Sequence, residues 1–329
     1  MTVLVITIIA IALIYDFLNG MNDAANSVAT VVATRVLSPF MAVLWAAFFN
    51  FAAYFLFGLH IANTMGKGIV DPTIIEPWFI FSALIGAALW VYICTHFGLP
   101  ISVSHSLIGG MVGPALFFHG PSAVVAAGII KVSVFIILSP IIGFVLGYLL
   151  MVLTYWLLRN KKPGSVDHWF RYLQLLSSAF FSLGHGGNDA QKTMGIIAVL
   201  LFSTGYLGAE FYVPQWVVFS CYLAIGLGTL TGGWKVIKTM GVNLTDLKPV
   251  HGFSAETAGA MTLAMSSFMG IPVSTTHTIS GAIMGVGITR RVSAVRWKVA
   301  QGIIGAWIMT IPMTMVVSGL LYLLIKLFV

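Results

Sequence analysis

Four acidic side chains stand in apolar stretches of this chain, where a carboxylate is costly. They are Asp16, Asp23, Asp189 and Glu256. A charged group at the centre of a membrane helix costs about 2.5–3.5 kcal/mol on insertion scales, and such groups usually mark an ion or substrate pathway. The other acidic residues fall in polar connections, where solvation explains them. The four carboxylates in apolar surroundings are therefore the first candidates for chemistry.

Asp23 and Asp189 belong to a motif that occurs twice. Residues 19–27 read Asn-Gly-Met-Asn-Asp-Ala-Ala-Asn-Ser, and residues 185–193 read His-Gly-Gly-Asn-Asp-Ala-Gln-Lys-Thr. The alternative to a function is a structural ion pair or a carboxylate that caps a helix break. Because the same expensive residue returns at the same place, we interpret both aspartates as functional.

Lys192 aligns with Asn26 in this repeat. Three interpretations are open. The lysine neutralises a neighbouring aspartate, attracts an anion, or stands where the other half uses a bound cation.

A second motif also occurs twice. Residues 98–106 read Gly-Leu-Pro-Ile-Ser-Val-Ser-His-Ser, and residues 270–278 read Gly-Ile-Pro-Val-Ser-Thr-Thr-His-Thr. Proline favours a helix start and hydroxyl side chains cap it, so each tip presents free backbone N–H groups and hydroxyls. Helix N-termini of this kind bind anions. His105 and His277 recur as well, and we interpret them first as ordinary hydrogen-bonding groups.

The composition identifies the setting of these motifs. The chain of 329 residues is 59% apolar and 8% charged, whereas a soluble domain carries about 25% charged residues. Its uncharged runs exceed the roughly 20 residues of a spanning helix. The net charge of +7 is attributed to cytoplasmic loops, so no nucleic acid is expected as a partner. No zinc spacing or Walker loop is present, and neither a cofactor nor nucleotide hydrolysis is expected.

The repeats divide the chain into an N-terminal half (1–158), a cytoplasmic linker (159–168) and a C-terminal half (169–329). The sequence predicts an all-α polytopic membrane protein in which each half has the same four parts. These are a helix interrupted by the Asn-Asp motif (2–34 and 169–201), a plain span (39–63 and 214–238), two apolar arms that fold back at the Gly-x-Pro tip (78–97 with 103–118, and 253–268 with 276–289) and a long final segment (122–158 and 294–326).

Three net crossings per half place the two halves in inverted topology. With both termini outside and the linker in the cytoplasm, 12 of the 16 basic residues fall inside, as the positive-inside rule favours. Inverted repeats with interrupted helices are typical of secondary transporters, whose site lies at mid-membrane.

On the two Asn-Asp motifs (20–27 and 185–192) and the second hydroxyl-rich tip (270–277), essentially the whole chain resembles the inorganic phosphate transporter (PiT) family. The resemblance implies a cation-coupled symporter in the cell membrane that carries phosphate inward, with two re-entrant hairpins and as a homodimer. Proton-coupled bacterial relatives often have His-Asp in the first motif. Asn22-Asp23 resembles the sodium-coupled members instead, and this favours Na⁺ over H⁺ as the coupling ion.

By this likeness the four motifs would form the phosphate and cation sites. The residues expected at phosphate are Asn22, Asp23, Ser102, Ser104, Asn188, Asp189, Ser274, Thr275 and Thr276. Those expected at the coupling cation are Asp23, Asn26, Asp189, Ser106 and Thr278. Further candidates are Lys192, His105, His277 and Glu256.

Three other functions remain open from the sequence. The first is a sulfate symporter of the same family, although sulfate has no counterpart of the P–OH group from which an aspartate can accept a hydrogen bond. A passive anion channel would need no coupling ion. A membrane-embedded enzyme would need a nucleophile and a base, and only the two histidines hint at one, so no enzymatic activity is expected.

Overall fold

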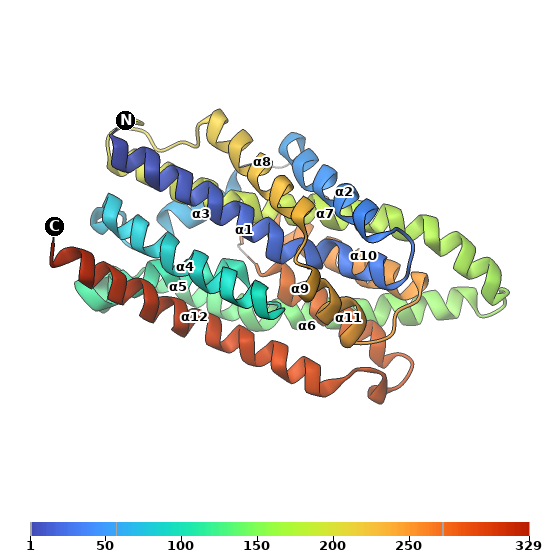
Figure 1. The fold of residues 1–329 in the computed structure, drawn as a ribbon. Coiled ribbons are helices and arrows are strands. Elements are labelled where there is room, and N and C mark those ends of the chain that lie inside the picture. Colours follow the sequence, from blue (N-terminus) through green and yellow to red (C-terminus); the bar gives the residue numbers. More distant parts are fainter. Residues whose placement is uncertain (1, 57, 272, 329) are drawn as a thin grey trace.

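The long apolar runs of the sequence fold into α-helices that lie side by side in an elongated bundle (Figure 1). The structure, a computed structural model, describes residues 2–56, 58–271 and 273–328, and no β-strand occurs within them. The helices of the N-terminal half are α1 (Val3–Ala33), α2 (Pro39–Ala52), α3 (His60–Lys67), α4 (Pro77–Phe97), α5 (Val103–Pro114) and α6 (Ala126–Leu158). Those of the C-terminal half are α7 (Pro163–Ser203), α8 (Gln215–Thr231), α9 (Trp234–Lys238), α10 (Pro249–Phe268), α11 (Thr275–Ile288) and α12 (Trp297–Lys326).

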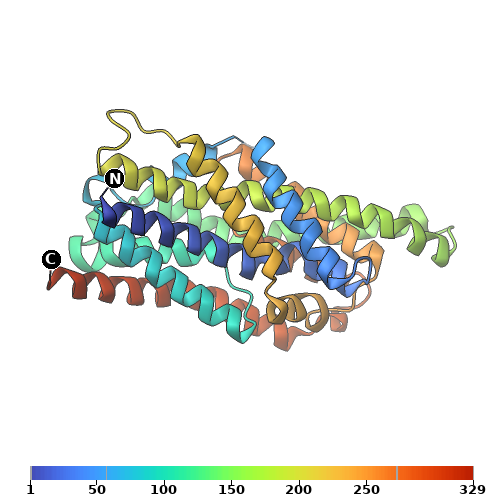
Figure 2. The ribbon, with the colours of Figure 1, turned by 45° about the horizontal axis from the view of Figure 1, so that its top comes forward.

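Corresponding helices of the two halves run in opposite directions along the bundle (Figures 1 and 2). α1, α4 and α6 run away from the end that carries the N-terminus, whereas α7, α10 and α12 run back towards it. Both termini therefore lie at one end, and the α6–α7 connection lies at the other.

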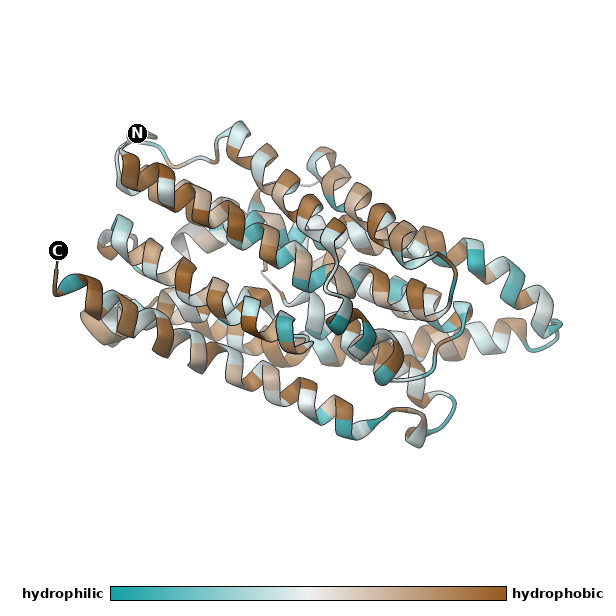
Figure 3. Ribbon diagram, viewed as in Figure 1, coloured by the Kyte–Doolittle hydropathy of each residue, from teal (hydrophilic) through white to brown (hydrophobic). Residues whose placement is uncertain are grey.

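Several helices are long and apolar enough to cross a membrane. Among the described residues, α1, α4, α6 and α12 meet this condition, and α8 joins them if it counts as one span with the helix after its 66° bend. Apolar residues dominate the long helices in Figure 3, and polar residues gather near the α6–α7 connection. At 1.5 Å per residue the 41 residues of α7 reach about 60 Å, so α7 extends well beyond a hydrocarbon core of about 30 Å.

The expected interruption of two helices is wrong. α1 and α7 run unbroken through both Asn-Asp motifs. The glycines there serve close packing: a Cβ on Gly20 would lie 2.2 Å from the carbonyl oxygen of Ile225 on α8, and one on Gly186 would lie 2.4 Å from that of Asn50 on α2. The motifs therefore let neighbouring helices approach without breaking their own.

Two further boundaries differ from the expectation. α7 begins at Pro163, so the connection between the halves shortens from the predicted 159–168 to 159–162, since a proline at the first helical position starts the helix early. The predicted spans 39–63 and 214–238 are not single helices. The second bends at Gly232 and Gly233, and the first passes from α2 through a 3₁₀ turn before α3; residue 57 lies outside the described residues.

The hairpin of each half packs against the last helix of the other half. α5 packs on α12, the last helix of the other half, and α11 packs on α6. The approach is close because the facing residues are small. A Cβ on Gly281 of α11 would lie 2.2 Å from the Pro140 carbonyl oxygen, and one on Gly109 of α5 would lie 2.7 Å from that of Ile311. The two hairpins meet where the hydroxyl of Thr276, at the start of α11, lies 3.0 Å from the carbonyl oxygen of Ile101, just before α5.

Candidate functional site

α1 and α7 bring the two repeated aspartates to one place. The Nε2 atom of His185 lies 3.1 Å from Oδ2 of Asp189 and 3.9 Å from Oδ2 of Asp23. The three side chains are at most 2% exposed, and each offers a ligand atom within 4.8 Å of the others. The convergence of residues 23 and 189 is thus present in the structure, and the group has the donor types that hold a cation.

Both hairpin tips end in a capped helix start. The hydroxyl of Ser102 accepts a hydrogen bond from the backbone N–H of His105 (3.3 Å), and that of Ser274 accepts one from the backbone N–H of His277 (3.2 Å). Both serines have extended backbone, as an N-cap requires. The first amides of α5 and α11 have no acceptor within their own helices and carry partial positive charge.

The second tip contacts both aspartates through hydroxyl groups. Thr275 Oγ1 donates to Asp189 Oδ2 (3.0 Å), and Thr276 Oγ1 lies 3.1 Å from Asp23 Oδ1. The amide nitrogen of Asn26 donates to both hydroxyls, at 3.2 and 3.0 Å. These contacts join α1, α7 and α11, so the two halves contribute to a single polar cluster.

Lys192 binds the first tip to the same cluster. Its Nζ atom donates to the carboxylate of Asp189, to the hydroxyl of Ser104 and to the carbonyl oxygen of Val273 (2.9 Å). Lys192 is 2% exposed. A buried ammonium is tolerated only with such partners.

Three asparagines of the repeated motifs keep unused acceptors. The Asn22 amide donates to Thr95 (2.7 Å), and the Asn188 amide donates to Ser266 and Ser267 (3.5 and 3.4 Å). Within the described residues, the Oδ1 atoms of Asn22, Asn26 and Asn188 are buried without a hydrogen-bond partner. Buried acceptors are normally satisfied, so these oxygens are available to a ligand.

Two predicted cation ligands are not brought to the carboxylates. Ser106 donates to the carbonyl oxygen of Val103 (2.7 Å), and Thr278 donates to that of Ser274 (2.9 Å). Each hydroxyl is one turn inside its own helix and bonds that helix's backbone. We therefore do not retain Ser106 and Thr278 among the ligands.

The two histidines of the tips pack together. The rings of His105 and His277 meet edge to face with centroids 4.7 Å apart, and His277 stacks on Trp307 at 3.8 Å. Trp307 in turn donates to the carbonyl oxygen of Pro100 (3.0 Å). The two histidines and Trp307 thus pack the two tips together. Neither histidine is placed as a nucleophile or base beside Asp23 or Asp189.

Glu256 belongs to a different buried cluster. Its carboxylate accepts hydrogen bonds from Thr30 (2.5 Å), Gln174 (3.0 Å) and Ser177 (2.5 Å). Thr30 is one helical turn past Asn26, so this cluster ties α10 to α1 and α7 on the side of the α6–α7 connection. The structure does not place Glu256 in the group around Asp23 and Asp189.

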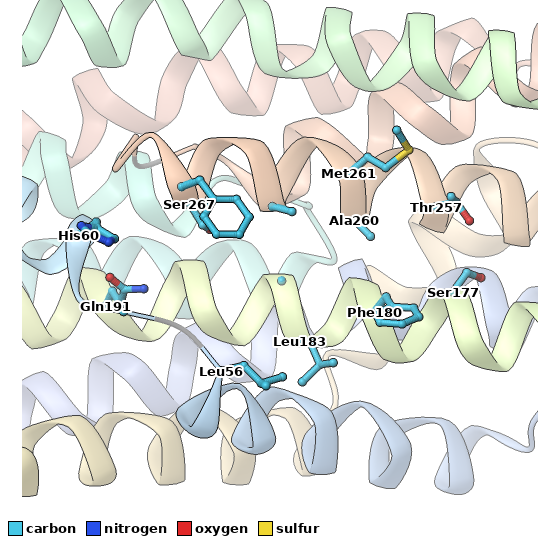
Figure 4. A pocket seen from close by; sticks show the side chains of 14 residues that line it. Leu56, His60, Ser177, Phe180, Leu183, Gln191, Thr257, Ala260, Met261 and Ser267 are labelled. Atoms are coloured by element: carbon cyan, nitrogen blue, oxygen red, sulfur yellow. The ribbon is translucent and has the colours of Figure 1, made fainter.

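An apolar groove lies beside the cluster, between α7 and α10 (Figure 4). It has a volume of about 530 Å³, and no Asp, Glu, Lys or Arg is among its described lining residues. Its polar lining residues are His60, Ser177, Gln191, Thr257 and Ser267, and Ser267 also accepts from Asn188. The groove lacks charged groups for an anion, so the site is the central cluster and not this groove.

His185 is the site residue that the sequence analysis did not single out. Its Nδ1 atom lies 3.0 Å from Oδ1 of Asn50, and its Nε2 faces both aspartates. Residues four apart share one face of a helix, so the spacing of His185 and Asp189 was a signal that could have identified it. No comparable signal existed for Asn50, which lies outside both repeated motifs.

The fold and the cluster define a polytopic helical protein with a buried polar centre shared by two repeated halves, as membrane transporters have. Its sequence matches the model of the phosphate transporter family over residues 19–318. It is 57% identical over 319 residues to a probable low-affinity inorganic phosphate transporter of Rhizobium meliloti, covering 97% of this chain and 96% of the relative. A protein of the same description in Bacillus subtilis is 39% identical over 326 residues, covering 98% of each chain.

A solved structure described as the sodium-dependent phosphate transporter matches over 100% of both chains, with a TM-score of 0.89 and 26% identity. The chain therefore belongs to the phosphate transporter family, and it is a transporter and not an enzyme.

Proposed function

We propose that the protein imports inorganic phosphate across the cell membrane by symport with a cation, with Na⁺ favoured over H⁺. The observation that carries the proposal is the meeting of Asp23 and Asp189 with two hydroxyl-rich helix starts in one buried cluster. Carboxylates beside an anion would repel it. A cation bound to them removes that repulsion, so phosphate binding becomes dependent on the cation.

Phosphate is the anion that this arrangement suits. Near neutral pH phosphate keeps a proton, so an ionised aspartate can accept a hydrogen bond from its P–OH group. Sulfate has no proton and would leave the acceptor facing a like charge, which costs affinity. The first amides of α5 and α11 and the hydroxyls of Ser104, Thr275 and Thr276 would donate to the remaining oxygens.

Na⁺ is supported by the kind of donors that face the cluster. Hard cations take carboxylate, main-chain carbonyl and asparagine oxygens as ligands, and the unpartnered Asn22 and Asn26 oxygens are of this kind. The sodium-dependent neighbour in structure points the same way.

The fold also supports inverted repeats and alternating access. The helices of the two halves run in opposite directions (Figure 1), and the cluster residues Asp23, Asp189 and Lys192 are at most 2% exposed. The cluster is closed to both ends here, so transport requires movement of one group of helices against the other. We place both termini outside, the 159–162 connection in the cytoplasm and two copies in a homodimer.

The test is ³²P-phosphate uptake into proteoliposomes under separately imposed Na⁺ and H⁺ gradients, with sulfate as competitor. The proposal expects uptake driven by an inward Na⁺ gradient and unaffected by excess sulfate. Uptake driven by the H⁺ gradient alone would replace Na⁺ by H⁺. Uptake without any gradient would indicate a channel, and competition by sulfate would overturn the substrate assignment.

A further inference from the structure

The repeat creates two equivalent positions that are surrounded by the same kinds of oxygen atom. A lysine ammonium group occupies one of them and not the other. In the Asn-Asp motif, Asn26 is equivalent to Lys192 and Asp23 is equivalent to Asp189. In the hydroxyl-rich tip motif, Thr276 is equivalent to Ser104, and Ile101 is equivalent to Val273. The contacts of Lys192 can therefore be compared atom by atom with those of its counterpart.

Beside Asp189 an ammonium group fills the position. The Nζ atom of Lys192 has three oxygen neighbours of different kinds: the carboxylate of Asp189, the hydroxyl of Ser104 and the main-chain carbonyl of Val273. A carboxylate, a hydroxyl and a carbonyl from an irregular tip are also the ligands that a transporter offers to a coupling cation.

The equivalent position beside Asp23 has the same three kinds of oxygen and no ammonium. Thr276 Oγ1 lies 3.1 Å from Asp23 Oδ1 and 3.0 Å from the carbonyl oxygen of Ile101. Asn26, which stands where the lysine would be, is 1% exposed, and its Oδ1 atom has no hydrogen-bond partner in the described parts of the chain. That oxygen is a fourth possible cation ligand beside the other three.

The charges differ in the same sense. Asp189 has an ion pair with Lys192, whereas the one ion-pair contact of Asp23 within the described residues is His185 at 3.9 Å. A buried carboxylate without a counter-charge is costly. Asp23 is therefore the carboxylate that needs a cation from solution.

We propose that Lys192 is a covalently attached replacement for one of two symmetry-related coupling cations. One exchangeable cation then binds at Asp23, Asn26, Thr276 and the Ile101 carbonyl, and Lys192 occupies the equivalent position at Asp189. The protein consequently moves one cation fewer per phosphate than it would with asparagine at both positions. The proposal rests on the proposed function, since it assigns the stoichiometry of that site.

The test is the Lys192→Asn variant, which gives both halves the same residue. We expect the number of cations moved per phosphate to rise by one. The ratio is measured in proteoliposomes from the cation gradient that just balances an opposing phosphate gradient at zero membrane potential, with the cation that drives the wild type. Lys161→Asn, in the exposed connection between the halves, is the matched control and keeps the wild-type ratio.

The reverse variant, Asn26→Lys, keeps the test decisive if Lys192→Asn does not transport. It should remove the dependence of the purified protein's melting temperature on cation concentration, because both positions then hold an ammonium. Each exchangeable site adds a stabilisation that grows with the logarithm of cation concentration. Lys192→Asn should accordingly steepen this dependence about twofold.

Two results would overturn the proposal and leave the proposed function intact. One is a cation-driven Lys192→Asn variant with the wild-type ratio, which would make Lys192 a structural partner of Asp189 only. The other is an Asn26→Lys protein that cations still stabilise as they do the wild type. Wild-type uptake with no cation dependence would instead contradict the proposed function itself.

Discussion

The two halves of the molecule are alike in backbone packing and unlike in charge. Gly109 and Gly281 occupy equivalent places, and each lets its helix, α5 or α11, pack closely on the last helix of the opposite half. Asp23 and Asp189 are also equivalent, but among the described residues Asp189 has a lysine partner and Asp23 has none. The comparison teaches that the repeat supplies the framework, and that a few substitutions between the copies give the two equivalent aspartates different charged partners.

The largest effect is expected from a substitution that removes the ion pair found at one of the two aspartates. Asp189→Asn leaves the buried Lys192 ammonium without its carboxylate, and loss of one partner of a buried ion pair costs about 3–5 kcal/mol. Thermal melting of the purified protein should show a marked drop in stability. The double variant Asp189→Asn/Lys192→Asn should recover most of it. A double variant no more stable than the single one would contradict the pairing.

Asp23→Asn should affect transport more than stability, because Asp23 has no ammonium partner to leave unpaired. We expect cation-driven phosphate uptake to fall at least 100-fold, which corresponds to about 2.7 kcal/mol, with a normal elution profile and melting temperature. The uptake assay described above measures it. Unchanged uptake would remove Asp23 from the mechanism.

The symmetric side of the comparison predicts equal effects in the two halves. Alanine at Gly281 places a Cβ 2.2 Å from the Pro140 carbonyl oxygen, and alanine at Gly109 places one 2.7 Å from that of Ile311. Overpacking of this kind costs about 1–3 kcal/mol. Gly302→Ala on α12 meets no atom within 4 Å and should be neutral or slightly stabilising.

Melting temperatures of the three glycine variants check this prediction. A loss at Gly281 with none at Gly109 would show that the halves do not pack alike.

The smallest effect concerns an ion pair that joins Glu76 of the N-terminal half to Lys326 of the C-terminal half. Lys326 Nζ lies 2.5 Å from Oε1 of Glu76, to which Tyr322 also donates at 2.7 Å, whereas the residue equivalent to Glu76 is Lys248. Burial raises the pKa of Glu76, but the hydrogen bonds from Lys326 and Tyr322 outweigh it and hold the pKa below its ordinary value.

Since the pKa of Glu76 is lower in the folded state, the pair stabilises the protein above the unfolded pKa, and this stability is lost as pH falls through the folded pKa. Lys326→Met should cost less than about 1 kcal/mol at pH 7, because such partly exposed pairs contribute little. The difference from the wild type should shrink in acid. Melting curves at pH 7 and pH 4 measure it, and a difference that grows in acid would contradict the assignment.

The sequence predicted the class of fold and the partners in the site through its repeats. The convergence of Asp23 and Asp189 followed from one costly residue that appears twice, and the capping of α5 and α11 followed from Ser102 and Ser274. The continuity of α1 and α7 did not follow, because glycine weakens an isolated helix yet permits close packing in a bundle. Whether Gly20 and Gly186 break their helices or let them pack closely depends on the helices that face them.

The hydroxyls of the tips show a second limit. Ser104 and Ser106 are two residues apart, and spacing alone does not tell which one faces the carboxylates. The structure directs Ser104 to Lys192 and Ser106 to its own helix. Likewise Glu256 shares the burial of Asp23, but its partners Gln174 and Ser177 come from a distant part of α7 that no motif marks.

The most direct test of the shared site is the affinity of the purified protein for phosphate, measured by titration calorimetry with and without the coupling cation. Coupling between two ligands is reciprocal and typically amounts to 1–3 kcal/mol. We expect the cation to tighten phosphate binding at least tenfold in the wild type and to have no effect in Asp23→Asn. Phosphate affinity that is independent of the cation in the wild type, or equally dependent on it in the variant, would contradict the account.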